Sequence, residues 1–353
     1  MVNSSSLESL RTEVSALLDE LPNMKHGALI QQALMTLVQM AEVEADRLDW
    51  KILGSALQDM EQAFRMFYPY RHVRKISIFG SARIAPTEKV YQMAVDFARC
   101  VTQQGFMVIT GGGPGVMQAG NEGAGPGQSF GLNIRLPFEQ GSNPFIEDER
   151  KLVNFKYFFT RKLFFLRESD ALALFPGGFG TLDEAFECLT LMQTGKSALV
   201  PLVLVDAPGG DYWQTWEAYI RGQLLKQGLI HSADLNLYTI TDRVDVACEA
   251  IASFYRVYHS SRYVGKQLVL RLNCDLSDAD LEYLNDNFSE MLVQGRIVKS
   301  KALPQENEPE IAHLPRLVLE FNQRDLGLLY QMIRVINKLL EADTPETTHP
   351  EQK

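Results

Sequence analysis

The segment Pro176–Glu184, with the sequence PGGFGTLDE, carries the residue types best suited to chemistry. It follows an apolar run, Ala171–Phe175, that predicts a strand, and it leads into a predicted helix, Leu182–Gln193. The first N–H groups of a helix lack partners within the helix and carry partial positive charge, so they can bind an anion. The segment therefore predicts a phosphate site, with the carboxylate of Glu184 about one turn into the helix.

A second glycine-rich run follows another predicted strand, Phe106–Thr110, and opens the predicted helix Val116–Gly123. Three successive glycines and a Pro-Gly pair are more than a tight turn needs, so we expect a second wall of the same ligand site. The carboxyl ends of parallel strands meet at one edge of a sheet, which would bring both runs together. The expected phosphate-binding residues are Gly177, Gly178, Gly180 and Thr181 in the first run and Gly111, Gly112, Gly113 and Gly115 in the second.

Three charged or polar residues complete this candidate site. Ser81 follows the first predicted strand and could donate a further hydrogen bond, although an ordinary loop serine is an equal interpretation. Arg161 and Lys162 lie in a predicted helix, Phe158–Arg167, that leads into the same sheet, where they could also be solvated charges. Glu184 has a structural alternative, because Thr181-Leu182-Asp183-Glu184 matches a capping box in which threonine and glutamate bond the helix start.

Other chemistries find little support in the sequence. The run Gly111–Val116 does not match Gly-x-Gly-x-x-Gly, which argues against a nicotinamide or flavin dinucleotide. Gly195-Lys196-Ser197 resembles the end of a Walker A loop, but the upstream glycine position is Thr190 and a helix precedes it. No His-Glu-x-x-His or Cys-x-x-Cys occurs, so we do not expect a dedicated zinc site or another metal site.

Alternating strand and helix patterns predict an α/β fold, a Rossmann-like doubly wound parallel sheet. The predicted strands are Lys75–Phe79, Phe106–Thr110, Ser129–Ile134, Ala171–Phe175, Leu199–Val205 and Leu237–Ile240. The predicted helices are Glu88–Gln104, Val116–Gly123, Phe158–Arg167, Leu182–Gln193, Trp213–Gln223 and Asp242–Tyr258.

The chain divides into four expected regions. Residues 1–72 predict a helical N-terminal arm, which serves as a cap or for dimerisation, and residues 73–260 hold the Rossmann-like catalytic domain. Residues 261–342 predict a small α+β accessory domain in the order β-α-β-β-α, and residues 343–353 a disordered tail.

Composition excludes several classes of function. The formal net charge of −10 argues against a nucleic-acid partner, because phosphate backbones attract clustered Lys and Arg. No apolar run is long enough to span a membrane, and the N-terminus does not read as a signal peptide. Four scattered cysteines fit reduced thiols, so we expect a cytoplasmic location.

The motif Pro-Gly-Gly-x-Gly-Thr-x-x-Glu, preceded by Arg161 and Lys162, resembles the LONELY GUY (LOG) family of phosphoribohydrolases, especially its long bacterial members. The resemblance covers about residues 75–240 and includes Gly111–Met117 and Gly131–Ile134. It implies a hydrolase that splits a nucleoside 5′-monophosphate, AMP-like or a cytokinin riboside monophosphate, into free base and ribose 5-phosphate. It further implies that Arg161 and Glu184 are the catalytic pair and that no cofactor is required. Family members act as homodimers or larger assemblies, with the site near the subunit interface.

Two other readings stay open at this stage. The same fold could bind or carry a phosphorylated ligand such as molybdenum cofactor without catalysis, as carrier proteins that resemble this family do. The chain could also be a regulatory assembly protein whose terminal regions are the functional part. Lysine decarboxylation is set aside, because it needs a lysine that holds pyridoxal phosphate, and nothing marks one. The base and the number of subunits stay open.

Overall fold

The computed structural model describes residues 16, 19–43, 45–136, 141–146 and 149–339, and the tail expected over 343–353 lies outside them. The chain forms two compact units, residues 1–58 and 59–353. The first unit contains the short 3₁₀ helix η1 (Leu21–Asn23), helix α2 (Gly27–Glu42) and the start of α3 (Arg47–Phe67), which continues into the second unit. The described part of the N-terminal region is thus helical, as the sequence predicts.

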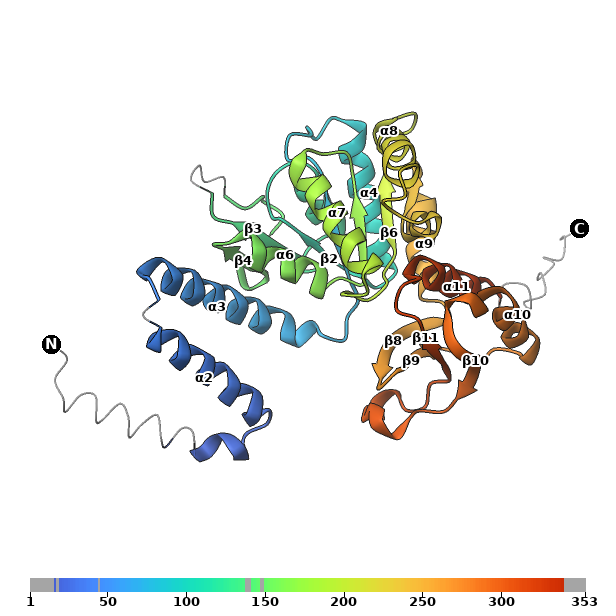
Figure 1. Cartoon of the computed structure of the whole chain (residues 1–353). Coiled ribbons are helices and arrows are strands. Elements are labelled where there is room, and N and C mark those ends of the chain that lie inside the picture. The colour runs from blue at the N-terminus through green and yellow to red at the C-terminus, as the bar shows by residue number, and fades with distance from the viewer. Residues whose placement is uncertain (1–15, 17–18, 44, 137–140, 147–148, 340–353) are drawn as a thin grey trace, which may run out of the picture. The chain divides into compact units, whose positions relative to one another are not determined.

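A seven-stranded parallel sheet forms the centre of the second unit (Figure 1). Its order is β4-β3-β2-β1-β5-β6-β7, so the chain winds from β1 toward one edge and then crosses to build the other. The strands are β1 (Lys75–Phe79), β2 (Met107–Thr110), β3 (Ser129–Ile134), β4 (Leu152–Phe155), β5 (Ala171–Leu174), β6 (Leu202–Val205) and β7 (Thr239–Thr241). This topology confirms the predicted doubly wound, Rossmann-like α/β fold.

Helices cover both faces of this sheet, which explains why its strands are nearly continuous apolar runs. In β6, Leu202 and Leu204 belong to one apolar cluster, whereas Val203 and Val205 belong to the other. The first cluster includes residues of α6 (Phe158–Arg167), α7 (Phe179–Gln193) and α8 (Tyr212–Tyr219), together with the end of α3. The second includes residues of α4 (Lys89–Gln103), α5 (Val116–Ala124) and α9 (Val244–Phe254).

Most element bounds in this sheet layer lie close to the predicted ones, although β6 begins three residues late, at Leu202, and α9 ends four residues early, at Phe254. Strands β1 and β3 and helix α6 have the predicted bounds. The sequence does not predict β4, an edge strand of four residues whose Asn154 is exposed, because the apolar pattern is too short to detect. The predicted helix Trp213–Gln223 is α8 followed by a π-helix, η4 (Ile220–Leu225).

The last part of the described chain forms a four-stranded antiparallel sheet with two helices (Figure 1). The strand order is β10-β11-β9-β8. The elements are β8 (Tyr258–Val264), β9 (Gln267–Leu272), α10 (Asp278–Phe288), β10 (Leu292–Ser300), β11 (Arg316–Phe321) and α11 (Leu326–Leu339). The predicted β-α-β-β-α order is present, but β8 precedes it. The sequence does not predict β8, because it is polar and only Tyr258 is buried.

Short 3₁₀ helices connect these elements: η2 (Tyr68–Tyr70), η3 (Glu149–Lys151), η5 (Ser232–Leu237), η6 (Ser289–Met291), η7 (Pro304–Glu306) and η8 (Pro309–Ile311). None of the described helices has the length and apolar character needed to cross a bilayer. The described side chains also include no cluster of three or more His, Cys, Asp or Glu residues suited to a metal ion. The four cysteines are free thiols.

Candidate functional site

Helix α7 begins earlier than the sequence predicts, and this decides the surroundings of Glu184. The helix starts at Phe179, with Gly178 as its N-cap, and no side chain caps it. Thr181 is therefore already inside the first turn, so the capping box of Thr181 and Glu184 does not form. That structural alternative for Glu184 is wrong, and its carboxylate has no role in closing the helix start.

Glu184 is instead a buried carboxyl with an unused oxygen. Glu184 is 5% exposed, and its Oε2 has no hydrogen-bond partner among the described residues. Desolvation raises the pKa of Glu184 to about 7, although the nearby charges of Lys162 and Arg161 lower it. A carboxyl that can gain or lose a proton near neutral pH is suited to general acid–base chemistry.

Lys162 lies on α6 and faces the acidic side of α7. Its Nζ lies 2.6 Å from Oδ2 of Asp183, 2.8 Å from Oε2 of Glu187 and 3.9 Å from Oε1 of Glu184. Burial alone would lower the pKa of Lys162, but the hydrogen bonds to Asp183 and Glu187 raise it. The ammonium group of Lys162 thus contacts carboxylates. This arrangement favours a role in lowering the pKa of Glu184 over the phosphate contact that the sequence predicts.

Arg161, one residue earlier on α6, points toward the glycine-rich run after β2. A Cβ built on Gly111 would lie 4.0 Å from Nη1 of Arg161. Burial lowers the pKa of this guanidinium, and the charges of Glu184 and Asp183 oppose that shift. Its Nε has no hydrogen-bond partner among the described residues, while the group stacks over Phe158 at 4.8 Å. The structure therefore brings Arg161 near both the Gly111–Gly115 loop and the Glu184 carboxyl.

Asp59, near the middle of α3, holds the start of helix α6 in place. Its Oδ2 accepts hydrogen bonds from the backbone N–H groups of Lys156 at 3.0 Å and Tyr157 at 3.4 Å, and from Oγ1 of Thr160 at 2.9 Å. A carboxylate at a helix N-terminus complements the unpaired N–H groups and the helix dipole. Sequence reasoning misses this residue, because Asp59 is about a hundred residues away from the helix that it caps.

Ser81 connects the two glycine-rich loops through its backbone. Its N–H donates to the carbonyl of Pro176 at 3.1 Å, and its carbonyl accepts from the N–H of Val116 at 3.0 Å. The loops after β1, β2 and β5 therefore meet at one edge of the sheet, as predicted from the parallel topology. The Ser81 hydroxyl accepts a bond from the N–H of Arg83 at 3.1 Å and so also shapes its own turn.

Two of the predicted glycines are required by this close packing. Gly115 has a φ of +67°, and a Cβ there would lie 2.3 Å from the carbonyl oxygen of Ser81. A Cβ on Gly177 would lie 2.1 Å from Oγ1 of Thr181. By contrast, a Cβ on Gly178 or Gly180 would meet no atom within 4 Å. The fold does not require glycine at these two exposed positions, whereas a ligand that approaches the helix start closely would.

A buried amide network, which sequence reasoning misses, fixes the Gly111–Gly115 loop. Nδ2 of Asn143 donates to the carbonyl of Gly113 at 3.0 Å and to Oδ1 of Asn121 at 2.9 Å. The hydroxyl of Thr110 also donates to Oδ1 of Asn121 at 2.7 Å and accepts from the N–H of Gly112 at 3.0 Å. Asn121 and Asn143 are both buried. In the sequence, only the position of Asn121, in the helix that follows the Gly111–Gly115 loop, could have pointed to this network.

Part of the chain that holds this site matches a known protein family. Residues 104–251 match a family model described as possible lysine decarboxylase. The comparison with curated proteins finds no match.

Several solved structures are similar to about half of the chain. One is the structural genomics target TM1055, with 21% identity, a TM-score of 0.37, and coverage of 50% of this chain and 98% of that chain. A molybdenum cofactor binding protein from Rippkaea orientalis has 18% identity, a TM-score of 0.36, and coverage of 51% and 96%. The molybdenum cofactor carrier protein from Chlamydomonas reinhardtii has 19% identity, a TM-score of 0.36, and coverage of 51% and 96%.

The matched residues include most of the site just described. They contain the loop Gly111–Gly115, the pair Arg161 and Lys162, and the loop and helix start from Pro176 to Glu184. These are also the motifs on which the resemblance in the sequence rests. Over residues 104–251, the chain therefore matches the family model described as possible lysine decarboxylase, at the same motifs that resemble the LOG family.

Proposed function

We propose that this protein hydrolyses the N-glycosidic bond of a nucleoside 5′-monophosphate to the free base and ribose 5-phosphate. The observation that carries this proposal is Glu184, a buried carboxyl with an unpartnered oxygen and a pKa of about 7. It lies at the sheet edge where two glycine-rich loops meet, beside Arg161. Perturbed carboxyl groups at such positions are typical of catalytic sites.

The 5′-phosphate would bind at the start of α7. No side chain caps this helix, and its first N–H groups, those of Phe179 and Gly180, precede the first backbone bonds, which Thr181 and Leu182 donate to the Gly178 carbonyl at 3.1 and 3.2 Å. The open space beside Gly178 and Gly180 lets an anion approach these groups. Binding at the phosphate, far from the bond that breaks, supplies orientation for the chemical step.

Cleavage would build positive charge on the ribose ring, as it does in glycoside hydrolysis. The ionised Glu184 would stabilise that charge and accept a proton from water, whose oxygen bonds to the anomeric carbon. The base leaves with the electrons of the broken bond and takes up a proton, so one water molecule is consumed for each product pair. Arg161 would orient phosphate or ribose oxygens, since its planar guanidinium can make paired hydrogen bonds.

The proposed assembly is a homodimer or a larger homo-oligomer, as the family resemblance implies. Large apolar side chains are exposed beside the site: Phe158, Phe159 and Leu163 on α6, and Phe179, which is 94% exposed, at the start of α7. Exposed apolar groups gathered near one surface favour burial against a partner. Size-exclusion chromatography with light scattering tests this, and a Phe159→Asp variant that stays as large as the wild type would argue against α6 as the contact.

Incubation of the full chain with AMP tests the proposed reaction most directly. We expect adenine and ribose 5-phosphate in equal amounts, and a panel of other nucleoside monophosphates would identify the preferred base. Arg161→Ala should lower turnover on the order of a hundredfold, the usual range for a group that positions or stabilises the reacting atoms. AMP that binds but stays intact, with every other nucleotide of the panel also unchanged, would favour a non-catalytic carrier.

A further inference from the structure

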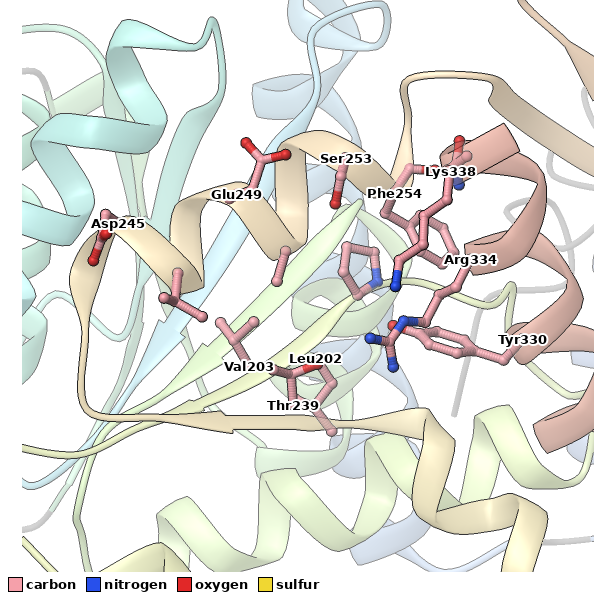
Figure 2. Close-up of a pocket in the computed structure, with 14 residues that line it drawn as sticks. Leu202, Val203, Thr239, Asp245, Glu249, Ser253, Phe254, Tyr330, Arg334 and Lys338 are labelled. Atoms are coloured by element: carbon pink, nitrogen blue, oxygen red, sulfur yellow. Dashed lines mark hydrogen bonds between the residues drawn. The ribbon is translucent and has the colours of Figure 1, made fainter. Parts of the chain in front are cut away.

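A cavity of about 460 Å³ lies at the opposite end of the central sheet from the glycine loops (Figure 2). Leu202 and Thr239, at the amino ends of β6 and β7, line it, while the glycine loops follow the carboxyl ends of β2 and β5. Helix α9 forms one wall and helix α11 another. The cavity is thus separate from the candidate catalytic site, and its volume falls within the range of about 300–1,000 Å³ of small-molecule sites.

Two cations from one face of α11 enter this cavity. Arg334 and Lys338 are four residues apart, so their side chains project from adjacent turns of the helix. In Figure 2 both side chains extend toward the floor of the cavity, and the guanidinium of Arg334 lies beside the ring of Tyr330. Neither cation forms an ion pair with any residue that the structure describes.

The acidic groups of the cavity are already neutralised. Glu249 on α9 lies 2.7 Å from Nη2 of Arg256, and Asp245 accepts hydrogen bonds from the guanidinium of Arg243. Among the described residues that line the cavity, no carboxylate is paired with Arg334 or Lys338, so their positive charges favour an anion.

The rest of the lining is apolar or already bonded. Leu202, Val203 and Phe254 are almost fully buried and form the floor and one wall. Asn337 cannot contribute to binding, because its amide is fully used. Its Oδ1 accepts from the N–H groups of Val257 and Tyr258, and its Nδ2 donates to the carbonyls of Phe254 and Ile333. These bonds fix α11 against the end of α9, so the cavity walls are held in place.

We propose that this cavity binds a small organic anion, a carboxylate or a phosphate ester that carries a flat apolar group. The anionic group lies between Arg334 and Lys338, where an arginine fork suits either head group. The apolar group lies against Phe254 and Leu202, away from water. Such a ligand joins α9 of the central layer to α11 of the C-terminal part.

Calorimetric titration of the full chain with matched probes tests this site. Benzoate and phenyl phosphate share a ring and differ in the head group, while inorganic phosphate lacks the ring. We expect at least one ring-bearing probe to bind, and to bind more tightly than inorganic phosphate. The double variant Arg334→Ala/Lys338→Ala should raise its Kd tenfold or more. Ala250→Phe, which fills the cavity without changing charge, should also weaken binding.

Two controls separate this site from other sources of anion affinity. Arg324→Ala/Lys301→Ala removes the same charge from exposed positions outside the cavity and should leave the Kd unchanged. Gly178→Val obstructs the proposed phosphate position at α7 and should also leave it unchanged, because a Cβ there meets no atom of the fold. The proposal is overturned if neither ring-bearing probe binds at millimolar concentration. It is equally overturned if Gly178→Val, and not the double variant on α11, abolishes binding.

Discussion

Two buried glutamates in this protein, Glu184 in α7 and Glu306 in η7, experience opposite environments. They are 5% and 3% exposed, so both have lost nearly all contact with water. Desolvation raises the pKa of Glu184 to about 7, because its Oε2 is unpartnered and the nearest cation, Lys162, is shared with two other carboxylates. Burial alone would do the same to Glu306, but its partners lower its pKa below the ordinary value.

The partners of Glu306 explain the difference. Its Oε1 accepts from the N–H of Leu303 at 2.9 Å and from Nε of Arg316 at 3.2 Å, and its Oε2 accepts from Nε of Arg271 at 2.8 Å. A buried carboxylate with a complete set of donors has partners that offset its desolvation. A carboxylate with a free oxygen and a raised pKa lowers the stability of the folded state, and the fold alone does not explain why it is buried. Burial by itself therefore does not identify a functional acid. Burial together with an unpartnered oxygen and a raised pKa marks a candidate.

Of substitutions at Glu306 and Glu184, Glu306→Ala should change the free energy of unfolding more. The substitution leaves the guanidinium groups of Arg271 and Arg316 buried without their shared carboxylate, and removing one partner of a buried ion pair costs about 3–5 kcal/mol. Urea unfolding at pH 7 measures the loss. The exposed neighbour Glu310 is the matched control, and Glu310→Ala should change the free energy of unfolding by less than about 0.5 kcal/mol. An equal, small effect of both variants would contradict the structural role of Glu306.

Glu184→Gln should reduce turnover of the nucleotide by about a hundredfold or more, because an amide can neither take the proton from water nor carry the negative charge. That loss corresponds to about 2.7 kcal/mol of transition-state stabilisation. Steady-state release of base from AMP measures it, with Asp183→Asn as the neighbouring control. If Glu184→Gln retains wild-type turnover, Glu184 is not the catalytic acid or base.

The same Glu184→Gln variant should be more stable than the wild type at pH 8. The folded-state pKa of about 7 exceeds the ordinary value of 4.5, so the stability linked to the protonated carboxyl is present below about pH 4.5 and is lost as pH rises through about 7. At about 1.4 kcal/mol for each pKa unit, the variant should gain roughly 2–3 kcal/mol at pH 8. It should gain almost nothing at pH 4.5. Parallel unfolding curves at these two pH values check the sign, and a gain that is larger at pH 4.5 would contradict it.

Lys162→Met should move the pH dependence of the reaction, with a smaller effect on its maximum. The charge of Lys162 lowers the pKa of Glu184, so its removal raises that pKa. In the wild type, kcat/KM should rise with pH through about 7, as Glu184 ionises. In the variant, we expect the midpoint of this pH profile to lie about one pH unit higher, because a nearby opposite charge typically shifts a carboxyl pKa by about that amount. The exposed Lys226→Met serves as control, and an unchanged midpoint in Lys162→Met would argue against this coupling.

The regular elements could be predicted because their causes are local. In β1, β3 and α6, the local pattern of apolar residues between helix or turn signals is sufficient to set the bounds. Strands β4 and β8 could not be predicted in the same way. Both are edge strands with polar or exposed residues, and they are strands because a neighbouring backbone offers hydrogen bonds to them.

The start of α7 shows how local rules can mislead. Gly180 disfavours helix, and Thr181 is a good capping residue, so the sequence places the helix start at Leu182. In the structure the chain becomes helical at Phe179, directly after a loop whose Gly177 carbonyl accepts a bond from the hydroxyl of Tyr212 at 2.7 Å. The tertiary arrangement of β5 and α8 around this loop outweighs a local preference of about 1 kcal/mol.

The sequence by itself determines the parallel sheet, the two glycine-rich loops at one of its edges, and the residue types, a carboxyl and a guanidinium, that follow them. It does so because the alternation of strand and helix patterns and the backbone freedom of glycine are local consequences of composition and spacing. Only the tertiary structure decides that Asp59 fixes the helix of Arg161 and that Asn121 and Asn143 hold the Gly111–Gly115 loop. It also decides that Glu184 is buried with an oxygen that has no partner among the described residues. These properties depend on contacts between distant segments, since desolvation and hydrogen-bond satisfaction are set by what surrounds a group and not by its neighbours in the chain.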